Sequence, residues 1–225
     1  LKRMTEMDVI EPSEGPWASP VVLIPKPDGS VRFCVDYRRL NSGTTKDSYA
    51  LPRVDDSLDS LGGAQYFSTL DANSGYWQIA VNPADRDKTT FTTHRGIYRF
   101  KRLPFGLVSA PATFQRAIDV ILISVRFRCA LTYLDDIIVF SSTFEQHIRD
   151  LDLVLSLVRS AGVTQKLAKC RFAAREVPYL GYIVGREGLR VDESKISSLQ
   201  AAVPPQTKMG IIRFFEMCGV YRRFI

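Results

Sequence analysis

The chain has 225 residues and a mass of 25.4 kDa, with 45% hydrophobic and 24% charged residues. This composition excludes a largely disordered chain, and the length is enough for one large domain or two smaller ones. Thirty basic residues against twenty-four acidic ones give a formal net charge of +6, which suits a polyanionic partner such as nucleic acid.

Strand-like runs and turns dominate the first hundred residues. Residues 21–24 and 31–35 are rich in β-branched side chains and flank the loop PKPDGS, which predicts a hairpin. Residues 52–63 predict a short helix that ends at glycines. QYFSTL predicts a strand ending at Asp71, followed by an irregular turn and more extended chain, and KTTFTTHRGIYRFKR predicts two strands around RG.

Two amphipathic helices are predicted in the second half. SAPATFQRAIDVILISV carries apolar residues at helical spacing over residues 109–125. STFEQHIRDLDLVLSLVRSAG begins with Thr143 and Gln146 at the spacing of a capping box and ends at Gly162. Helices of this kind pack their apolar face against a sheet.

Between these helices, TYLDDIIVF sets Asp135 and Asp136 between two apolar runs. A continuous strand would bury both carboxylates without partners, at a large cost in free energy. A hairpin would place them at its tip, so the sequence predicts a hairpin here.

The last part of the chain changes character near residue 190. VPYLGYIVGREGLRVD predicts a hairpin of residues 179–184 and 189–191 around GREG. Beyond Asp192 the pattern is helical, with a break at Pro204 and Pro205. We therefore expect a boundary near residue 190.

The number and spacing of the cysteines and histidines limit which metal sites and disulfides the chain could form. Four scattered cysteines and two histidines offer no zinc spacing and no disulfide framework. The chain has no membrane-length apolar run and no signal-like start, so we expect an intracellular protein with no membrane partner, not a secreted one. It lacks an initiator Met, and we expect it to be a piece of a longer protein.

Asp71 and the pair Asp135 and Asp136 all lie at ends of predicted strands, where they could meet at one sheet edge. Three converging carboxylates repel one another unless a cation neutralises them. Oxygen ligands without His or Cys favour Mg²⁺, and two such ions are the usual machinery of phosphoryl transfer on nucleic acid.

Seven sequence motifs, in this order along the chain, resemble those of a known protein family. They are PVVLIPKPDGSVRFCVDYRRLN, FSTLDANSGYWQI, KTTFTTHRGIYRFKRLPFGLVSAPATFQ, YLDDIIVFS, LAKCRF, YLGYIV and YRRFI. Over residues 10–225 the chain resembles the polymerase portion of a gypsy (Ty3)-type long-terminal-repeat retrotransposon reverse transcriptase. The resemblance implies an α+β right-hand polymerase fold, whose palm has an antiparallel sheet backed by helices.

The same resemblance implies a division of the chain. Residues 1–70 would be mainly fingers with the start of a palm strand, and residues 71–190 mainly palm, with residues 86–104 fingers-like. Residues 191–225 would begin a helical thumb.

The resemblance also assigns catalytic roles. Asp71, Asp135 and Asp136 would bind two Mg²⁺ ions, with Mn²⁺ as an alternative, and the carbonyl of Ala72 would help to hold one of them. Asp135 would be the firm ligand and Asp136 a looser one. Lys169 would protonate the pyrophosphate leaving group.

Further positions match the substrate contacts of the family. Lys26 and Arg32 would close over the triphosphate of the incoming dNTP. Tyr76 would exclude a ribose 2′-hydroxyl, and Phe105 and Gly106 would line the other side of the nucleotide pocket. Phe105 stands where many retroviral relatives have Gln, so a polar contact to the nucleotide is lost there. The primer grip would be Tyr179, Leu180, Gly181 and Tyr182, and template contacts would be Arg38, Asn41, Arg99 and Arg102.

Each assignment has a simpler reading. An Asp at a strand end can cap a turn, Tyr76 can be a core residue beside Trp77, and a lysine or arginine in a loop is commonly just solvated. Trp77, Glu216 and Gly219 depart from the family pattern, the last two in the expected thumb.

The expected activity is RNA-directed DNA synthesis on a primed RNA or DNA template, within a polyprotein that also carries protease, ribonuclease H and integrase domains. The site of action would be a cytoplasmic virus-like particle or the nucleus. One alternative is a weak or inactive nucleic-acid-binding fragment of such an element. Another is a metal-dependent nuclease, which Lys26, Arg32 and Tyr76 disfavour because they serve a triphosphate.

Overall fold

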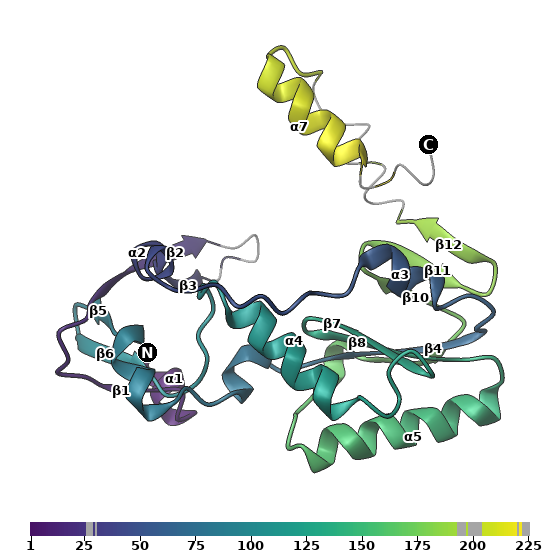
Figure 1. The fold of residues 1–225 in the computed structure, drawn as a ribbon, viewed down its shortest axis with the longest axis horizontal. Helices are drawn as coiled ribbons and strands as arrows, with labels where there is room; N and C mark the ends of the chain where they lie inside the picture. The colour runs from purple at the N-terminus through teal and green to yellow at the C-terminus, as the bar shows by residue number, and fades with distance from the viewer. Residues whose placement is uncertain (26–28, 30, 193–196, 198–203, 220, 222–225) are drawn as a thin grey trace.

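The computed structural model describes residues 1–25, 29, 31–192, 197, 204–219 and 221. Within these residues the chain forms three sheets of five, four and three strands, with helices packed between and beside them (Figure 1). The predicted mixed α+β class is confirmed.

The N-terminal sheet has five strands in the order β1–β6–β5–β2–β3. These are Ile10–Pro12, Gly96–Phe100, Phe91–Thr93, Ser19–Pro25 and Val31–Val35, and only the β2–β5 pair is parallel. Both predicted hairpins are confirmed. The short helices α1 (Lys2–Glu6) and α2 (Arg38–Ser42) and the 3-10 helix η2 (Pro83–Thr89) accompany this sheet, whose core includes Tyr37, Phe91 and Phe100.

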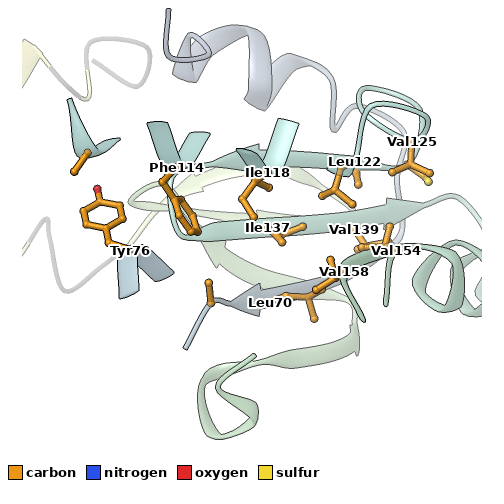
Figure 2. Close-up of a cluster of buried hydrophobic side chains, with 14 residues drawn as sticks. Leu70, Tyr76, Phe114, Ile118, Leu122, Val125, Ile137, Val139, Val154 and Val158 are labelled. Carbon is orange, nitrogen blue, oxygen red and sulfur yellow. The ribbon is translucent and has the colours of Figure 1, made fainter. Parts of the chain in front are cut away.

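The central sheet has the order β7–β8–β4–β9, formed by Ala130–Tyr133, Asp136–Ser141, Tyr66–Asp71 and Arg171–Ala174. Helices α4 (Ala110–Ile121) and α5 (Phe144–Ser160) pack on one face, where Phe114 and Val154 join the same buried cluster as Ile137 (Figure 2). α4 is shorter than predicted because residues 122–125 form turns. One half of the predicted capping box of α5 is confirmed, since Thr143 Oγ1 accepts the N–H of Gln146, whereas the side chain of Gln146 donates to Asp150.

Strand alternation decides which side chains reach each face of this sheet. Leu70 and Ile137 point toward α4 and α5, whereas Phe67 and Ile138 belong to a second cluster with α3 (Val54–Asp59) and the three-stranded sheet. Asp71 and Asp136 share the parity of Phe67 and Ile138, so they lie on the face turned toward the three-stranded sheet.

The three-stranded sheet is a meander of β10 (Glu176–Tyr179), β11 (Tyr182–Gly185) and β12 (Gly188–Val191). The hairpin around GREG is confirmed, but residues 179–184 are not one strand. Tyr179 ends β10, and the chain turns at Leu180 and Gly181, both with positive φ, before β11 begins.

Two further segments refine the predictions. The chain after Asp71 is not extended but forms the 3-10 helix η1 (Gly75–Gln78), because Ser74 adopts a left-handed φ of 52° and turns the backbone. Helix α7 (Lys208–Gly219) stands away from the sheets in Figure 1. Most of the helix predicted after Asp192 lies outside the described residues. In the part of the chain that the structure describes, no helix is long and apolar enough to cross a membrane.

Candidate active site

Asp71 and Asp136 face each other across the β4–β8 ladder. Asp71 is the last residue of β4 and Asp136 the first of β8, and they are direct partners in the antiparallel register. Directly opposed side chains lie on the same face with Cβ atoms about 4.5–5.5 Å apart. Two carboxylates from distant parts of the sequence are therefore held side by side by ordinary strand pairing.

Asp135 is placed by the turn between β7 and β8. Tyr133 pairs with Asp136, so the turn consists of Leu134 and Asp135, and the predicted hairpin is confirmed. The backbone carbonyl of Asp135 accepts the N–H of Ala72 at 3.2 Å, which ties the turn to the end of β4. Asp135 Oδ1 is buried and has no hydrogen-bond partner among the described residues.

Gly75 provides the space that this carboxylate occupies. A Cβ at Gly75 would lie 2.6 Å from Asp135 Oδ1 and 2.9 Å from Phe114 Cζ, closer than real Cβ contacts come. The glycine in ANSGYW is thus a requirement of the site and not only of a turn.

Lys169 reaches the aspartates from the 3-10 helix η3 (Leu167–Lys169). Its Nζ donates to Asp71 Oδ2 at 2.9 Å, and the backbone carbonyl of Asp71 accepts the N–H of Lys166. The hydrogen bond to Asp71 raises the pKa of the Lys169 ammonium. Lys169 is therefore held protonated beside the carboxylates.

The electrostatics of the aspartates are unfavourable. Burial raises the pKa of Asp135, and repulsion from Asp136 and Asp71 raises it further. The pKa of Asp136 is also raised, by burial and by repulsion from Asp71, and Lys169 offsets only part of this. Although Asp136 as a residue is exposed to solvent, burial of its carboxylate and repulsion from Asp71 both raise its pKa. A bound cation would relieve the repulsion.

A cleft of about 560 Å³ opens beside Asp71 and Asp136. It brings together predicted catalytic and primer-contacting residues from four separate elements, including Lys169, Tyr179, Leu180 and Gly181. Tyr179 is buried, its hydroxyl has no partner within the described residues, and burial and the charge of Asp136 raise its pKa. Tyr182, the fourth predicted primer-grip residue, is buried in the cluster behind this cleft.

Within the described residues, no three His, Cys, Asp or Glu side chains stand as a ready set of metal ligands. Lys169 engages one Asp71 oxygen, and Asp135 Oδ1 faces Gly75. The donor set nevertheless fits a hard cation such as Mg²⁺, because all donors are oxygens, they repel one another, and one is buried without a partner.

The predicted nucleotide pocket has an aromatic wall. Tyr76 is buried between Phe105 and Phe114, with ring centroids 4.9 and 5.5 Å away, and Phe105 is exposed. Gly106 adopts a φ of 96°, and its carbonyl accepts Asn41 Nδ2 at 2.8 Å. Asn41 Oδ1 also accepts the N–H of Val108, so Asn41 fixes the loop that carries Phe105.

Some of the predicted cationic contacts are exposed, and others form ion pairs with neighbouring carboxylates. Arg32 is exposed on β3, whereas Lys26 lies outside the described residues. Arg99 pairs with Glu11 and Asp87, and Arg38 pairs with Asp36, whose pKa it lowers to about 2. Arg102 lies 3.5 Å from the carbonyl of Gln78. The charge of Arg99 is thus used inside the fold, a role that the sequence did not indicate.

Sequence reasoning missed Gly75 and Gln115. Gln115 is fully buried in α4, and its Oε1 accepts the N–H of Leu134 in the aspartate turn at 2.6 Å. The one available signal was a polar side chain beside Phe114 and Ile118 in a helix predicted to pack on the sheet.

The chain matches a protein-family model described as reverse transcriptase (RNA-dependent DNA polymerase) over residues 24–184. It is 42% identical over its whole length to the retrovirus-related Pol polyprotein from transposon opus of Drosophila melanogaster, and 36% identical to that from transposon gypsy of the same species. It covers 23% and 22% of those two polyproteins, so it spans about a quarter of the length of these relatives.

A solved structure agrees with this fold. The foamy viral protease–reverse transcriptase, in a complex with double-stranded DNA, superposes with a TM-score of 0.90 at 24% sequence identity. The match covers 97% of this chain and 38% of the viral one. At this identity the likeness concerns the fold.

Proposed function

Because the chain belongs to the reverse transcriptase (RNA-dependent DNA polymerase) family, we propose that it extends a primer 3′-hydroxyl with dNTPs on an RNA or DNA template. The observation that carries this proposal is the set of Asp71, Asp136 and Lys169 in one cleft with the turn at Leu180 and Gly181, next to Asp135, whose Oδ1 is buried. A similarity to gypsy-type polyproteins along the whole chain supports it.

We propose that Asp71, Asp135 and Asp136 hold Mg²⁺, with the carbonyl of Ala72 as a further oxygen ligand. When bound, Mg²⁺ would activate the primer 3′-hydroxyl and stabilise negative charge at the α-phosphate. The mutual repulsion of Asp135 and Asp136 supports this assignment. Two ions, and the looser role of Asp136, remain parts of the proposal.

The other residues act on the substrates. Lys169 is a cation held by Asp71, and its ammonium would give a proton to the pyrophosphate leaving group. The Tyr76 ring would leave no space for a ribose 2′-hydroxyl, with Phe105 and Gly106 on the opposite wall. Arg32, together with Lys26, would neutralise the triphosphate.

The primer end would lie over Tyr179, Leu180, Gly181 and Tyr182. The positive φ of Leu180 and Gly181 turns the backbone at the mouth of the cleft, which supports this. Correct placement of the 3′-hydroxyl by backbone contacts matters more here than any one side chain. Arg38 and Arg102 would contact the template, and Asn41 would support the loop at Gly106.

In this proposal, residues 1–70 are mainly fingers, residues 71–190 mainly palm with fingers-like residues 86–104, and residues 191–225 the start of the thumb. The chain covers about a quarter of its relatives' polyproteins, which leaves room for protease, ribonuclease H and integrase domains. We propose that it acts inside the cell, in a cytoplasmic virus-like particle or the nucleus.

Primer extension on an RNA template tests the proposal. We expect the wild-type chain to incorporate dNTPs with Mg²⁺, and Asp135→Asn to lose this activity. Asp152→Asn is the matched control, because it makes the same charge change at an exposed position of α5. Equal activity of Asp135→Asn and wild type would remove Asp135 from the mechanism.

Two other outcomes would favour the alternatives. Tight binding of primer–template that resists salt, without extension, would make the chain a binding module, because simple phosphate contacts weaken steeply with salt. Cleavage of the nucleic acid in the absence of dNTPs would instead make the carboxylates part of a nuclease.

A further inference from the structure

The turn that carries Asp135 has an unfavourable backbone. Leu134 has a φ of 52°, in the left-handed region that residues other than glycine rarely adopt. Such conformations persist where the surroundings enforce them, and they often occur at functional sites. The contacts that enforce this turn are therefore worth identifying.

Gln115 on α4 contacts the turn directly. Its Oε1 accepts the N–H of Leu134 at 2.6 Å, and its Nε2 lies 2.9 Å from Thr132 Oγ1 and 3.2 Å from the Thr132 carbonyl. A backbone N–H can only donate, so it fixes which end of the amide faces the turn. Gln115 has no surface exposed to bulk solvent.

Asp119, one helical turn along α4, anchors the other end of this amide. Asp119 Oδ1 accepts Gln115 Nε2 at 3.0 Å and Thr132 Oγ1 at 2.7 Å. Its Oδ2 accepts the hydroxyl of Tyr49 at 2.6 Å and pairs with Arg126 at 3.3 Å. Both oxygens of this buried carboxylate are thus engaged, and a fully satisfied network of this kind is rigid.

We propose that Gln115 is a positioning residue for Asp135, and that Asp119 and Thr132 keep its amide aligned for that role. The bond from Leu134 to Gln115 holds one side of the turn, and the bond from Ala72 to the Asp135 carbonyl holds the other. Together they aim the carboxylate at the space beside Gly75. This inference rests on the proposed polymerase function for its effect on catalysis, but not for its effect on the turn.

Two substitutions at position 115 separate positioning from packing. Gln115→Met keeps the length of the side chain and removes its acceptor. Gln115→Glu keeps an oxygen for the Leu134 N–H but introduces an acidic group next to Asp119, so it disturbs the core at least as much. Ser141→Ala is the matched control, because it removes a buried hydrogen bond at the far end of β8.

The readouts are steady-state incorporation of one dNTP and hydrogen exchange of the Leu134 amide. Misplacing a catalytic group by about 1 Å can cost on the order of 10²-fold in rate. We expect Gln115→Met to lower kcat by about 10²-fold with little change in the KM for dNTP, and to expose the Leu134 amide to exchange. Gln115→Glu should be the less stable variant and yet retain more activity and a protected amide.

Several results would overturn the inference. One is a kcat for Gln115→Met equal to that of Ser141→Ala, and another is an equally protected Leu134 amide in Gln115→Met and wild type. If Gln115→Met fails to fold, Thr132→Val removes one anchor of the amide, and unchanged kcat and exchange there would also contradict it. An inactive wild-type chain would reject the proposed function, while amide exchange would still decide whether Gln115 holds the turn.

Discussion

The two ends of the β4–β8 strand pair differ in whether their polar side chains have hydrogen-bond partners. At the distal end, defined by Ser68, Ser141, His147 and Asp150, every side chain is hydrogen-bonded. Ser68 Oγ lies 2.7 Å from His147 Nε2, His147 Nδ1 lies 3.3 Å from Ser141 Oγ, and Ser141 donates to Asp150 at 2.8 Å. Burial lowers the pKa of His147, which stays neutral and suits this chain of bonds.

The catalytic end, named for the proposed role of Asp71, Asp135 and Asp136, which define it, lies a few residues away on the same two strands. Here like charges repel, Asp135 Oδ1 is buried without a partner in the described structure, and Leu134 has a left-handed backbone. One strand pair can therefore have one end whose polar side chains are all hydrogen-bonded and stabilise the fold. Its other end can have carboxylates that lack partners and are available to bind ligands. Substitutions at the two ends should therefore separate activity from stability.

The largest expected effect is at Asp71. Asp71→Asn removes one of the three carboxylates and should lower single-nucleotide incorporation by about 10³-fold or more. The free energy of unfolding should change little, because only the partly exposed pair with Lys169 is lost. Denaturant unfolding beside the incorporation assay checks both, with Asp152→Asn as control. A large loss of stability would show that the catalytic end also supports the fold.

The opposite pattern is expected at His147, which is fully buried. His147→Ala leaves Ser68 and Ser141 without this partner and creates a cavity, which should lower the free energy of unfolding by about 3 kcal/mol. Urea unfolding measures this, and kcat per folded molecule should stay near the wild-type value. His94→Ala, at the exposed second histidine, is the control. Loss of kcat without loss of stability would break the comparison.

Much of the fold was predictable because its signals are local. The strand-like residues of YFSTLD, the loop in PKPDGS and the burial cost of two aspartates each concern neighbouring residues, and they predicted β4, the β2–β3 hairpin and the β7–β8 hairpin. The resemblance added what local signals cannot give, namely that Asp71 and the pair Asp135 and Asp136 would act together. Asp71 lies opposite Asp136 because β4 pairs with β8.

What sequence reasoning missed depends on contacts between distant residues. The need for glycine at position 75 comes from the close approach of Asp135 and Phe114, and the pairing of Arg99 with Glu11 joins two strands far apart in sequence. The amide of Gln115 looks like any polar residue in a helix until Leu134 is folded against it. Periodicity reports which face is buried but not which partner a buried polar group will find.

Gly75 tests how tightly the catalytic end is built. Gly75→Ala places a methyl group 2.6 Å from Asp135 Oδ1, so the carboxylate or Phe114 must move. We expect a loss of about 10–10²-fold in kcat from misplacement and about 1–3 kcal/mol in stability from overpacking.

Single-nucleotide kinetics and urea unfolding measure the two effects of Gly75→Ala. Gly62→Ala is the matched control, since a Cβ there meets nothing closer than 3.4 Å. Wild-type kcat in Gly75→Ala would mean that Asp135 does not need its present position.

The smallest expected effects are on pH dependence, and they should have opposite signs at the two ends. Burial and repulsion from Asp71 raise the pKa of Asp136 in the folded protein, so ionisation of this carboxyl destabilises the fold as pH rises through that pKa. In metal-free buffer Asp136→Asn should therefore be the more stable protein at pH 7, by about 0.2–1 kcal/mol because exposure screens the charge. This gain should disappear as pH falls toward the ordinary value of 3.8.

At the distal end the pKa of His147 is lowered, so the unfolded chain takes up the proton first and stability falls as pH drops below the ordinary value of 6.5. His147→Gln should be less stable than wild type at pH 7, and the difference should shrink on acidification, because the variant has no imidazole to protonate. Thermal melts of both variants between about pH 3 and 8 on one buffer series, an interval that includes both ordinary values, compare the two ends directly. If both differences changed in the same direction with pH, the contrast between a repelling catalytic end and a satisfied distal end would be wrong.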